Sequence, residues 1–413
     1  MSRAKDTAHY PLYLSDFSLF VISMVSTFGG TLLLSIIGIR PTYYFVCISA
    51  VSAVLLLYGC RRVKRVGVPR SERCPSYYLS FVIWLWLLAP FVRRYSDYQT
   101  GWSELNVYGL APLVASLVCV AFIDITRIYN RLAGQLLLVM LASLVYGYFV
   151  GVIWVGPVPA TYAALNWFAP IVLAMFVFSY NNSYLDITKS VTSTFLIAIP
   201  LLSLYGLYQF LVLPPWDELW MRNIPMTSNG QPYPMRLRVF STMNSPMIYA
   251  PVTVTGMLLL LARGSFISVL SASIGLIGLG LSLVRSAWGA LFIGVIVLAV
   301  LAVKYDPRRA VWLVIGTIFA VCCLMVAVPM FSLEERLLSR IETITSLAND
   351  ISFVERQAFY ANTLGTVLDN IIGTGLGGVG LAQALTSGGA DAELAFDSGV
   401  LEIPMVLGWF GAV

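Results

Sequence analysis

Histidine is almost absent from this sequence, and charged side chains together make up a small share of it. Its 413 residues include one histidine, His9, and only 11% of them are charged. Histidine-based catalytic triads and histidine metal sites are therefore excluded. The cysteines lie in expected spans or on the expected cytosolic side, at positions 47, 60, 74, 119, 322 and 323. They indicate neither a disulfide framework nor a thiolate metal site, and we expect no metal and no cofactor.

The hydrophobic content, 59% of the residues, is far too high for a soluble protein of this length. It predicts an all-α polytopic integral membrane protein with about twelve transmembrane helices. The first run lacks a convincing cleavage site and is expected to stay as a helix. The last run has no polar stop, as expected of a chain that continues past Val413. The apolar runs fall at 17–38, 43–60, 77–92, 107–124, 132–151, 165–180, 190–212, 246–262, 265–284, 287–303, 310–331 and 398–413.

The basic residues predict the orientation of these spans. With the N-terminus in the cytosol, the basic loop at 61–73 lies inside, as the positive-inside rule requires. The later basic residues expected inside are Arg127, Arg131, Lys189, Arg263, Lys304, Arg308 and Arg309. All four lysines are then cytosolic, at positions 5, 64, 189 and 304. Every cation expected outside is an arginine, whose planar fork binds phosphate through two hydrogen bonds. These arginines are at positions 40, 93, 94, 222, 236, 238, 285, 336, 340 and 356.

Two long segments, 213–245 and 331–397, are expected outside the membrane. We therefore divide the chain into residues 1–189 with six spans, 190–331 with further spans and the first outer segment, the outer loop 332–397, and a final span at 398–413. The first outer segment is rich in proline and aromatic residues, which predicts an ordered, mostly irregular cap. Trp216, Trp220 and Tyr233 in this segment could stack on sugar rings, although tryptophans at a membrane interface also serve as anchors.

The second outer segment contains two similar helix starts, each with an arginine directly behind a capping box. They read Ser332-Leu-Glu-Glu-Arg336 and Ser352-Phe-Val-Glu-Arg356. The first predicts an amphipathic helix on the outer surface with Arg340 on the same polar face, and the second a helix over 353–372 closed by Gly373. A helix N-terminus with an arginine attracts anions such as phosphate. The alternative interpretation is two surface helices with ordinary caps.

Glycines and carboxylates follow these helices. The run from Gly375 and Gly377 to Gly380 has the spacing of a dinucleotide fingerprint, but it follows a helix and not a strand. We interpret it as a glycine turn that lets the backbone approach a ligand or another helix. Asp391 and Glu393 could hold a metal-bound nucleotide sugar, although such pairs are common by chance. No charge is expected at the middle of a span, which argues against a proton-coupled or ion-coupled transporter.

Three motifs resemble the O-antigen ligase/polymerase superfamily, which comprises the Wzy-type polymerases and lipid A-core ligases of bacterial envelope glycan assembly. They are Arg238-Val-Phe-Ser-Thr-Met-Asn244, Arg285-Ser-Ala-Trp288, and the stretch from Arg356 through Asp369-Asn-Ile-Ile-Gly-Thr-Gly-Leu-Gly377 to Asp397-Ser-Gly-Val-Leu-Glu402. The resemblance covers residues 190–413. It implies metal-independent, inverting glycosyl transfer on the periplasmic face of the inner membrane, between glycans linked to undecaprenyl diphosphate. The ligase branch would have a histidine where this chain has Asp397, so the polymerase branch is favoured.

A lipid diphosphate leaving group needs positive charge around it. We predict that Arg238, Arg285, Arg336, Arg340 and Arg356 converge and that some of them bind the diphosphate. Asp397 is the first candidate for the base and Glu335 the second. Expected partners are the lipid-linked donor and acceptor, membrane lipid and a chain-length regulator, with no nucleic acid. A ligase that uses a lipid A-core acceptor and a transporter of the same glycan remain alternatives.

Overall fold

The computed structural model describes residues 16–62, 76–104, 107–180, 183–224, 227–305, 351–380 and 399–412. Within these ranges the regular secondary structure is helical, apart from one isolated antiparallel bridge between Gly230 and Leu237. This confirms the predicted all-α class. The helices are α1 (Asp16–Met24), α2 (Gly30–Ile36), α3 (Thr42–Arg62), α4 (Ser76–Thr100), α5 (Leu110–Leu117), α6 (Ile125–Tyr129), α7 (Leu132–Trp154), α8 (Pro157–Ser179), α9 (Tyr184–Val212), α10 (Pro215–Asn223), α11 (Pro246–Arg263), α12 (Phe266–Ser282), α13 (Arg285–Tyr305), α16 (Ile351–Asp369) and α17 (Gly399–Ala412).

The described residues contain eight helices that are long and apolar enough to cross a membrane. One of them joins α1 and α2 through a π-helical turn at Val25–Gly29. Three shorter apolar helices, Leu110–Phe122, Phe266–Ser282 and Leu401–Ala412, coincide with further predicted spans. The predicted span 310–331 lies outside the described residues. The polytopic architecture is thus confirmed, and the domain divisions of the sequence analysis stay predictions.

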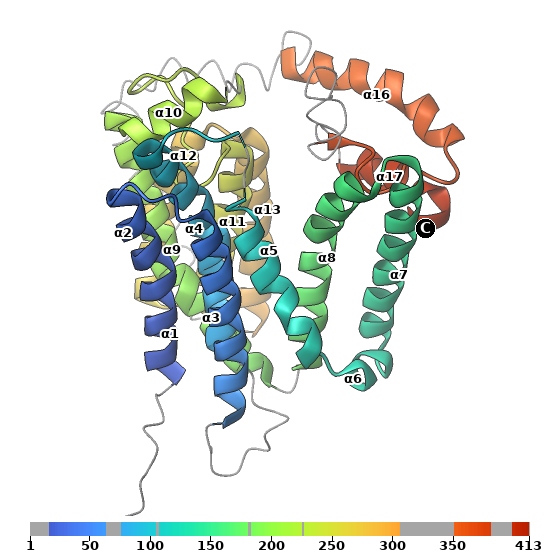
Figure 1. Ribbon diagram of the computed structural model, residues 1–413, viewed down its shortest axis with the longest axis horizontal. Coiled ribbons are helices and arrows are strands. Elements are labelled where there is room, and N and C mark those ends of the chain that lie inside the picture. The colour runs from blue at the N-terminus through green and yellow to red at the C-terminus, as the bar shows by residue number, and fades with distance from the viewer. Residues whose placement is uncertain are drawn as a thin grey trace, which may run out of the picture.

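Helix α9 lies at the centre of the main bundle, where it packs against α4, α11 and α12. Helices α7 and α8 form a hairpin beside this bundle, joined to it through the contact of α8 with α5, and α17 packs on α7 (Figure 1). Only 11% of the most apolar stretch of α13 is buried, although its mean hydropathy is 2.5. Such an exposed apolar helix surface is suited to contact with lipid.

The two ends of the bundle differ. Helices α10, α16 and α17 lie at one end, whereas α6, which carries Arg127, lies at the other (Figure 1). The segment 213–245 and the described part of the segment 331–397 are therefore on the same side. This arrangement agrees with the predicted placement of both segments on the side opposite Arg127.

Several element boundaries differ from the predictions. Helix α4 continues to Thr100 and not to residue 92, so Arg93, Arg94 and Asp97 are buried helical residues and not parts of an outer loop. Helix α8 begins at Pro157, before the predicted residue 165. Helix α16 ends at Asp369 and not at residue 372, because the side chain of Asn370 accepts a hydrogen bond from the N–H of Gly373 and forms a turn. Hydropathy marks the apolar centre of a helix better than its polar ends.

Candidate functional site

Arg238 joins the segment 213–245 to the connection between α12 and α13. Its guanidinium donates hydrogen bonds from Nε to the carbonyl oxygen of Ser282, at 3.0 Å, and from Nη2 to that of Leu283, at 3.2 Å. These carbonyls terminate α12, where the helix dipole favours a cation. Arg285, the first residue of α13, follows two positions later. The structure thus brings together the elements that carry two of the five predicted diphosphate ligands.

The backbone beside Arg238 is held by the side chain of Gln209, near the end of α9. The amide oxygen of Gln209 accepts hydrogen bonds from the N–H groups of Phe240, at 3.2 Å, and Ser241, at 2.9 Å. Its amide nitrogen donates to the carbonyl of Ser241, and the Ser241 hydroxyl donates to the carbonyl of Leu202. Both Gln209 and Ser241 are fully buried. A peptide with this many partners is fixed in place, and the position of Arg238 is fixed with it.

A buried ion pair lies next to this peptide. Arg94 of α4 and Asp217 of α10 approach to 2.8 Å, and both side chains are fully buried. Arg94 also donates a hydrogen bond of 2.7 Å to the carbonyl of Ser241. The second oxygen of Asp217 accepts hydrogen bonds of 2.7 Å from both Tyr205 and Gln209. Burial raises the pKa of the Asp217 carboxyl, whereas Arg94 and the two hydrogen-bond donors favour its ionised form.

A second group of charges lies at the same end of α4. Arg93 pairs with Asp97 at 3.3 Å and donates to the carbonyl of Ser103, while Arg40 lies 3.9 Å from the other oxygen of Asp97. The guanidinium of Arg93 also lies 5.0 Å from the ring centre of Trp220 and 5.4 Å from that of Trp102. These contacts are of cation–π type. Arg93 and Arg94 therefore hold α4, α10 and the adjoining loops together.

The three aromatic residues predicted to bind sugar differ in exposure. Trp220 is 3% exposed and packs against Trp102, so its ring is covered in this structure. Trp216 is partly exposed and packs edge-on against Phe91, Tyr95 and Tyr98 of α4. Tyr233 is 52% exposed. Trp216 and Tyr233 thus keep accessible ring surface, and their sugar-binding role stays a prediction.

The predicted glycine turn packs against other backbone. A Cβ at Gly375 would overlap the backbone of Gly151 in α7, and one at Gly377 would approach the peptide between Pro159 and Ala160 in α8. The intervening N–H of Leu376 donates a 2.8 Å hydrogen bond to the carbonyl of Gly147. Of the two roles foreseen for this turn, the structure thus shows close approach to other helices. Its contact with substrate stays a prediction.

Helix α17 is broken where it meets this turn. Pro404 lies inside the helix, and Gly408 has φ 64° and ψ 175°, which interrupts the helical path. Carbonyls of Met405 and Val406 accept hydrogen bonds from the N–H groups of Thr374 and Gly375. The backbone groups released by the break are thus satisfied within the protein, as an apolar environment requires.

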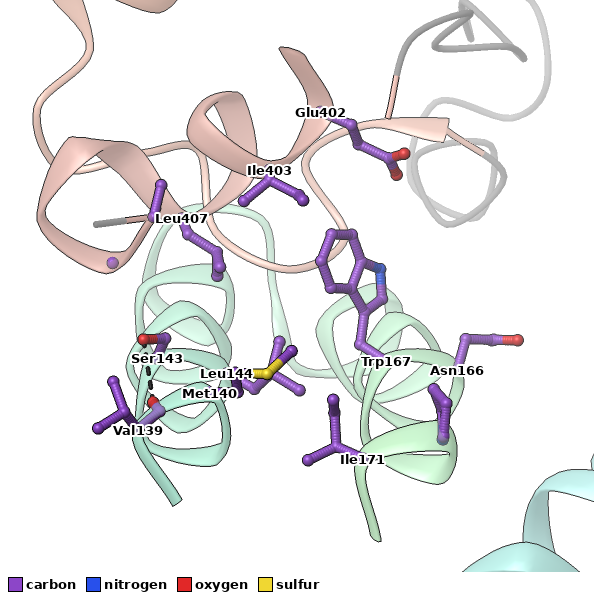
Figure 2. Close-up of a pocket in the computed structure, with 13 residues that line it drawn as sticks. Val139, Met140, Ser143, Leu144, Asn166, Trp167, Ile171, Glu402, Ile403 and Leu407 are labelled. Carbon is purple, nitrogen blue, oxygen red and sulfur yellow. Dashed lines mark hydrogen bonds between the residues drawn. The ribbon is translucent and has the colours of Figure 1, made fainter. Parts of the chain in front are cut away.

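A pocket of about 570 Å³ lies between α7, α8 and α17 (Figure 2). Apolar side chains such as Met140, Leu144 and Ile171 line most of it. Figure 2 shows Glu402 at the α17 side, close to the indole of Trp167. A pocket with apolar walls and a few polar groups fits an amphipathic molecule.

The remaining predicted site residues fall in or next to segments outside the described residues. Glu335, Arg336, Arg340 and Asp397 lie outside the described residues, and Arg356 is described only as a backbone position in α16. Within the described part of the chain, no three His, Cys, Asp or Glu side chains form a group suited to a metal ion. Convergence of the five arginines, the identity of the base and metal-independent chemistry all stay predictions.

Sequence reasoning missed Arg94, Gln209 and Asp217. The available signals were a glutamine near the end of an apolar run, an acidic residue beside Trp216, and two consecutive arginines at the end of a span. Burying a polar side chain costs free energy unless it forms a hydrogen bond or an ion pair. A polar residue within an apolar run therefore predicts a buried partner. The partner itself comes from a distant part of the chain and has no local signal.

Residues 270–413 match the family model described as O-antigen ligase. No curated protein and no solved structure gives a significant match to the chain. The matched region includes Arg285, Gly375, Gly377 and the broken helix α17, whereas Arg238 and Gln209 precede it. The match supports the resemblance to the O-antigen ligase/polymerase superfamily and indicates an activity of the ligase or polymerase type.

Proposed function

We propose that this protein polymerises lipid-linked oligosaccharide repeat units, because residues 270–413 match the family model described as O-antigen ligase. The donor is a glycan on undecaprenyl diphosphate, and the acceptor is a second lipid-linked repeat unit. The reaction takes place on the periplasmic face of the bacterial inner membrane. The enzyme is a glycosyltransferase of the polytopic, lipid-donor class, and a chain-length regulator is a candidate partner.

The observation that carries this proposal is the pair of hydrogen bonds that joins Arg238 to the end of α12. One of the two acceptors is the carbonyl of Leu283, which lies two residues before Arg285. A diphosphate leaving group gains negative charge as its bond to the sugar breaks, and fixed guanidinium groups stabilise that charge without reorganisation. Arg238 is held by the carbonyls of Ser282 and Leu283. Arg336, Arg340 and Arg356 are the further candidates for the same role.

The proposed reaction is a single displacement at the anomeric carbon. An acceptor hydroxyl attacks from the face opposite the diphosphate, and its proton passes to a carboxylate, for which Asp397 is the first candidate and Glu335 the second. The new glycosidic bond forms as the bond between carbon and phosphate oxygen breaks, which inverts the configuration. The lipid diphosphate leaves with the electron pair and is neutralised by the arginines.

The apolar part of the substrate fits the pocket between α7, α8 and α17. Its walls are largely apolar and its volume is about 570 Å³, enough for part of a polyprenyl chain. Among the exposed aromatic residues, Trp216 and Tyr233 are the candidates for contact with the glycan, and the glycine turn at Gly375 and Gly377 lies next to the α7–α8 hairpin.

The experiment that tests the assignment is reconstitution of the purified protein with a lipid-linked repeat unit. A polymerase yields a ladder of longer lipid-linked glycans. A ligase yields product only when a lipid A-core acceptor is added. A transporter moves the glycan across the bilayer without changing its length, and that result, or acceptor-dependent product alone, contradicts the proposal.

A further inference from the structure

The strained backbone of this protein is concentrated around Arg238. Within the described residues, four residues other than glycine have left-handed φ angles: Leu213 at 50°, Met235 at 59°, Ser241 at 54° and Leu283 at 55°. Met235 and Ser241 flank Arg238 on either side in the sequence. Leu283 accepts a hydrogen bond from its guanidinium. Leu213 ends α9, four residues after Gln209.

Left-handed backbone is unfavourable for side chains with a Cβ and is usually adopted by glycine. At the ends of α9 and α12, where glycine is the common residue, this chain has leucines that are 6% and 8% exposed. Strain of this kind persists only where the surroundings impose it, and it is typical of sites that hold a side chain ready for a ligand.

The contacts that impose the strain converge from three helices. Gln209 holds the peptide groups of Phe240 and Ser241 through three hydrogen bonds. Arg94 of α4 binds the same carbonyl of Ser241. Met235 donates its N–H, at 2.7 Å, to the carbonyl of Phe210, which is the residue after Gln209 in α9. On the far side, Val239 donates to the carbonyl of Leu281 at 3.1 Å. Arg238 therefore lies between anchor points on both sides.

We propose that Gln209 is a positioning residue for the binding of a diphosphate. It holds the strained peptide at Ser241 and thereby fixes Arg238 at the junction of α12 and α13, where it binds the diphosphate of a lipid-linked ligand. The inference rests on the proposed function, because it requires Arg238 to contact that ligand. A fixed guanidinium loses little conformational entropy on binding, so the affinity falls when the fixing contact is removed.

A double-mutant cycle with the full-length protein tests this role. The probe is farnesyl diphosphate, and farnesol, which lacks the anion, is the control ligand. We expect Gln209→Leu to weaken farnesyl diphosphate binding about tenfold when Arg238 is present and less than about twofold in an Arg238→Ala background. Farnesol affinity stays unchanged in both backgrounds. A purely structural effect of Gln209 would lower the affinity by the same factor in both.

A milder variant serves if Gln209→Leu does not fold. Ser241→Ala removes only the hydroxyl bond to Leu202 and should weaken binding about threefold, again only with Arg238 present. Ser49→Ala, which removes a buried hydrogen bond to Phe45 in α3, is the matched control and should have no effect. Equal losses in both Arg238 backgrounds overturn the positioning role alone. Unchanged binding in Arg238→Ala overturns the proposed diphosphate site together with it.

Discussion

The guanidinium of Arg94 and the carboxylate of Asp217 lie 2.8 Å apart, and neither side chain is exposed to solvent. This pair joins α4 to α10 and adjoins the peptide of Ser241, to which Arg94 also donates a hydrogen bond. Removing one member of a buried ion pair leaves the other charge without a partner, which is strongly destabilising. The geometry around Arg238 therefore depends on two residues that carry no predicted catalytic role.

Asp217→Asn is expected to destabilise the protein strongly. It leaves the charge of Arg94 buried without its partner, which costs about 3–5 kcal/mol. Thermal unfolding of the purified variant in detergent measures the effect. Asp124→Asn is the control, because Asp124 pairs with Arg127 at a partly exposed position and loss of this pair should cost less than about 1 kcal/mol. Similar melting temperatures for the two variants would show that the Arg94–Asp217 pair is not a stabilising contact.

The two tryptophans of α10 are expected to respond differently to substitution. Trp220→Ala removes a buried ring and should lower the stability by about 3–5 kcal/mol. Trp216→Ala removes a partly exposed ring, and it should lower the rate of glycan transfer with a smaller loss of stability. Parallel measurements of unfolding and transfer separate these effects. If Trp220→Ala lost transfer activity but kept its stability, the assignment of a structural role to Trp220 and a transfer role to Trp216 would be wrong.

Substitution of Gly375 by any residue with a side chain is expected to destabilise the protein. Gly375→Ala would drive a Cβ into the backbone of Gly151 and would also strain a residue with φ 78°. Gly380→Ala is a close control, because Gly380 has φ 73° and none of the described residues places an atom within 4 Å of its Cβ position. The control should cost roughly 1 kcal/mol from the backbone alone. Gly375→Ala should cost about 1–3 kcal/mol more. Equal unfolding temperatures would mean that the contact between the glycine turn and α7 is not tightly packed.

Much of the fold could be predicted from the sequence, because an apolar run of span length has few alternatives to a transmembrane helix. The runs at 132–151 and 190–212 became α7 and α9 with small changes at their ends. Hydropathy ends a span at the first charge and therefore predicts that Arg93 and Arg94 lie in a loop. In the folded protein, Asp97 pairs with Arg93 and Asp217 pairs with Arg94, so α4 continues past both arginines to Thr100.

The candidate site was predicted only in part. The sequence predicts that the motifs beginning at Arg238 and Arg285 act together. In the structure, Arg238 donates a hydrogen bond to the carbonyl of Leu283, two residues before Arg285. The sequence does not predict the supporting side chains, since Gln209 contacts Ser241 only after α9 and the segment 213–245 have packed together. Pairings between residues far apart in the chain depend on tertiary structure and leave no local pattern.

In the proposed mechanism, arginines on the outer face stabilise the leaving diphosphate without a metal ion. The most direct measurement compares glycan polymerisation by the wild-type protein and by Arg285→Ala and Arg238→Ala, all in EDTA, with folding checked for each. We expect a full product ladder from the wild type in EDTA and rates lower by about 100-fold or more in both variants, the size of effect seen when one electrostatic donor is removed. Loss of wild-type activity on chelation, or normal polymerisation by the folded arginine variants, would contradict the claim.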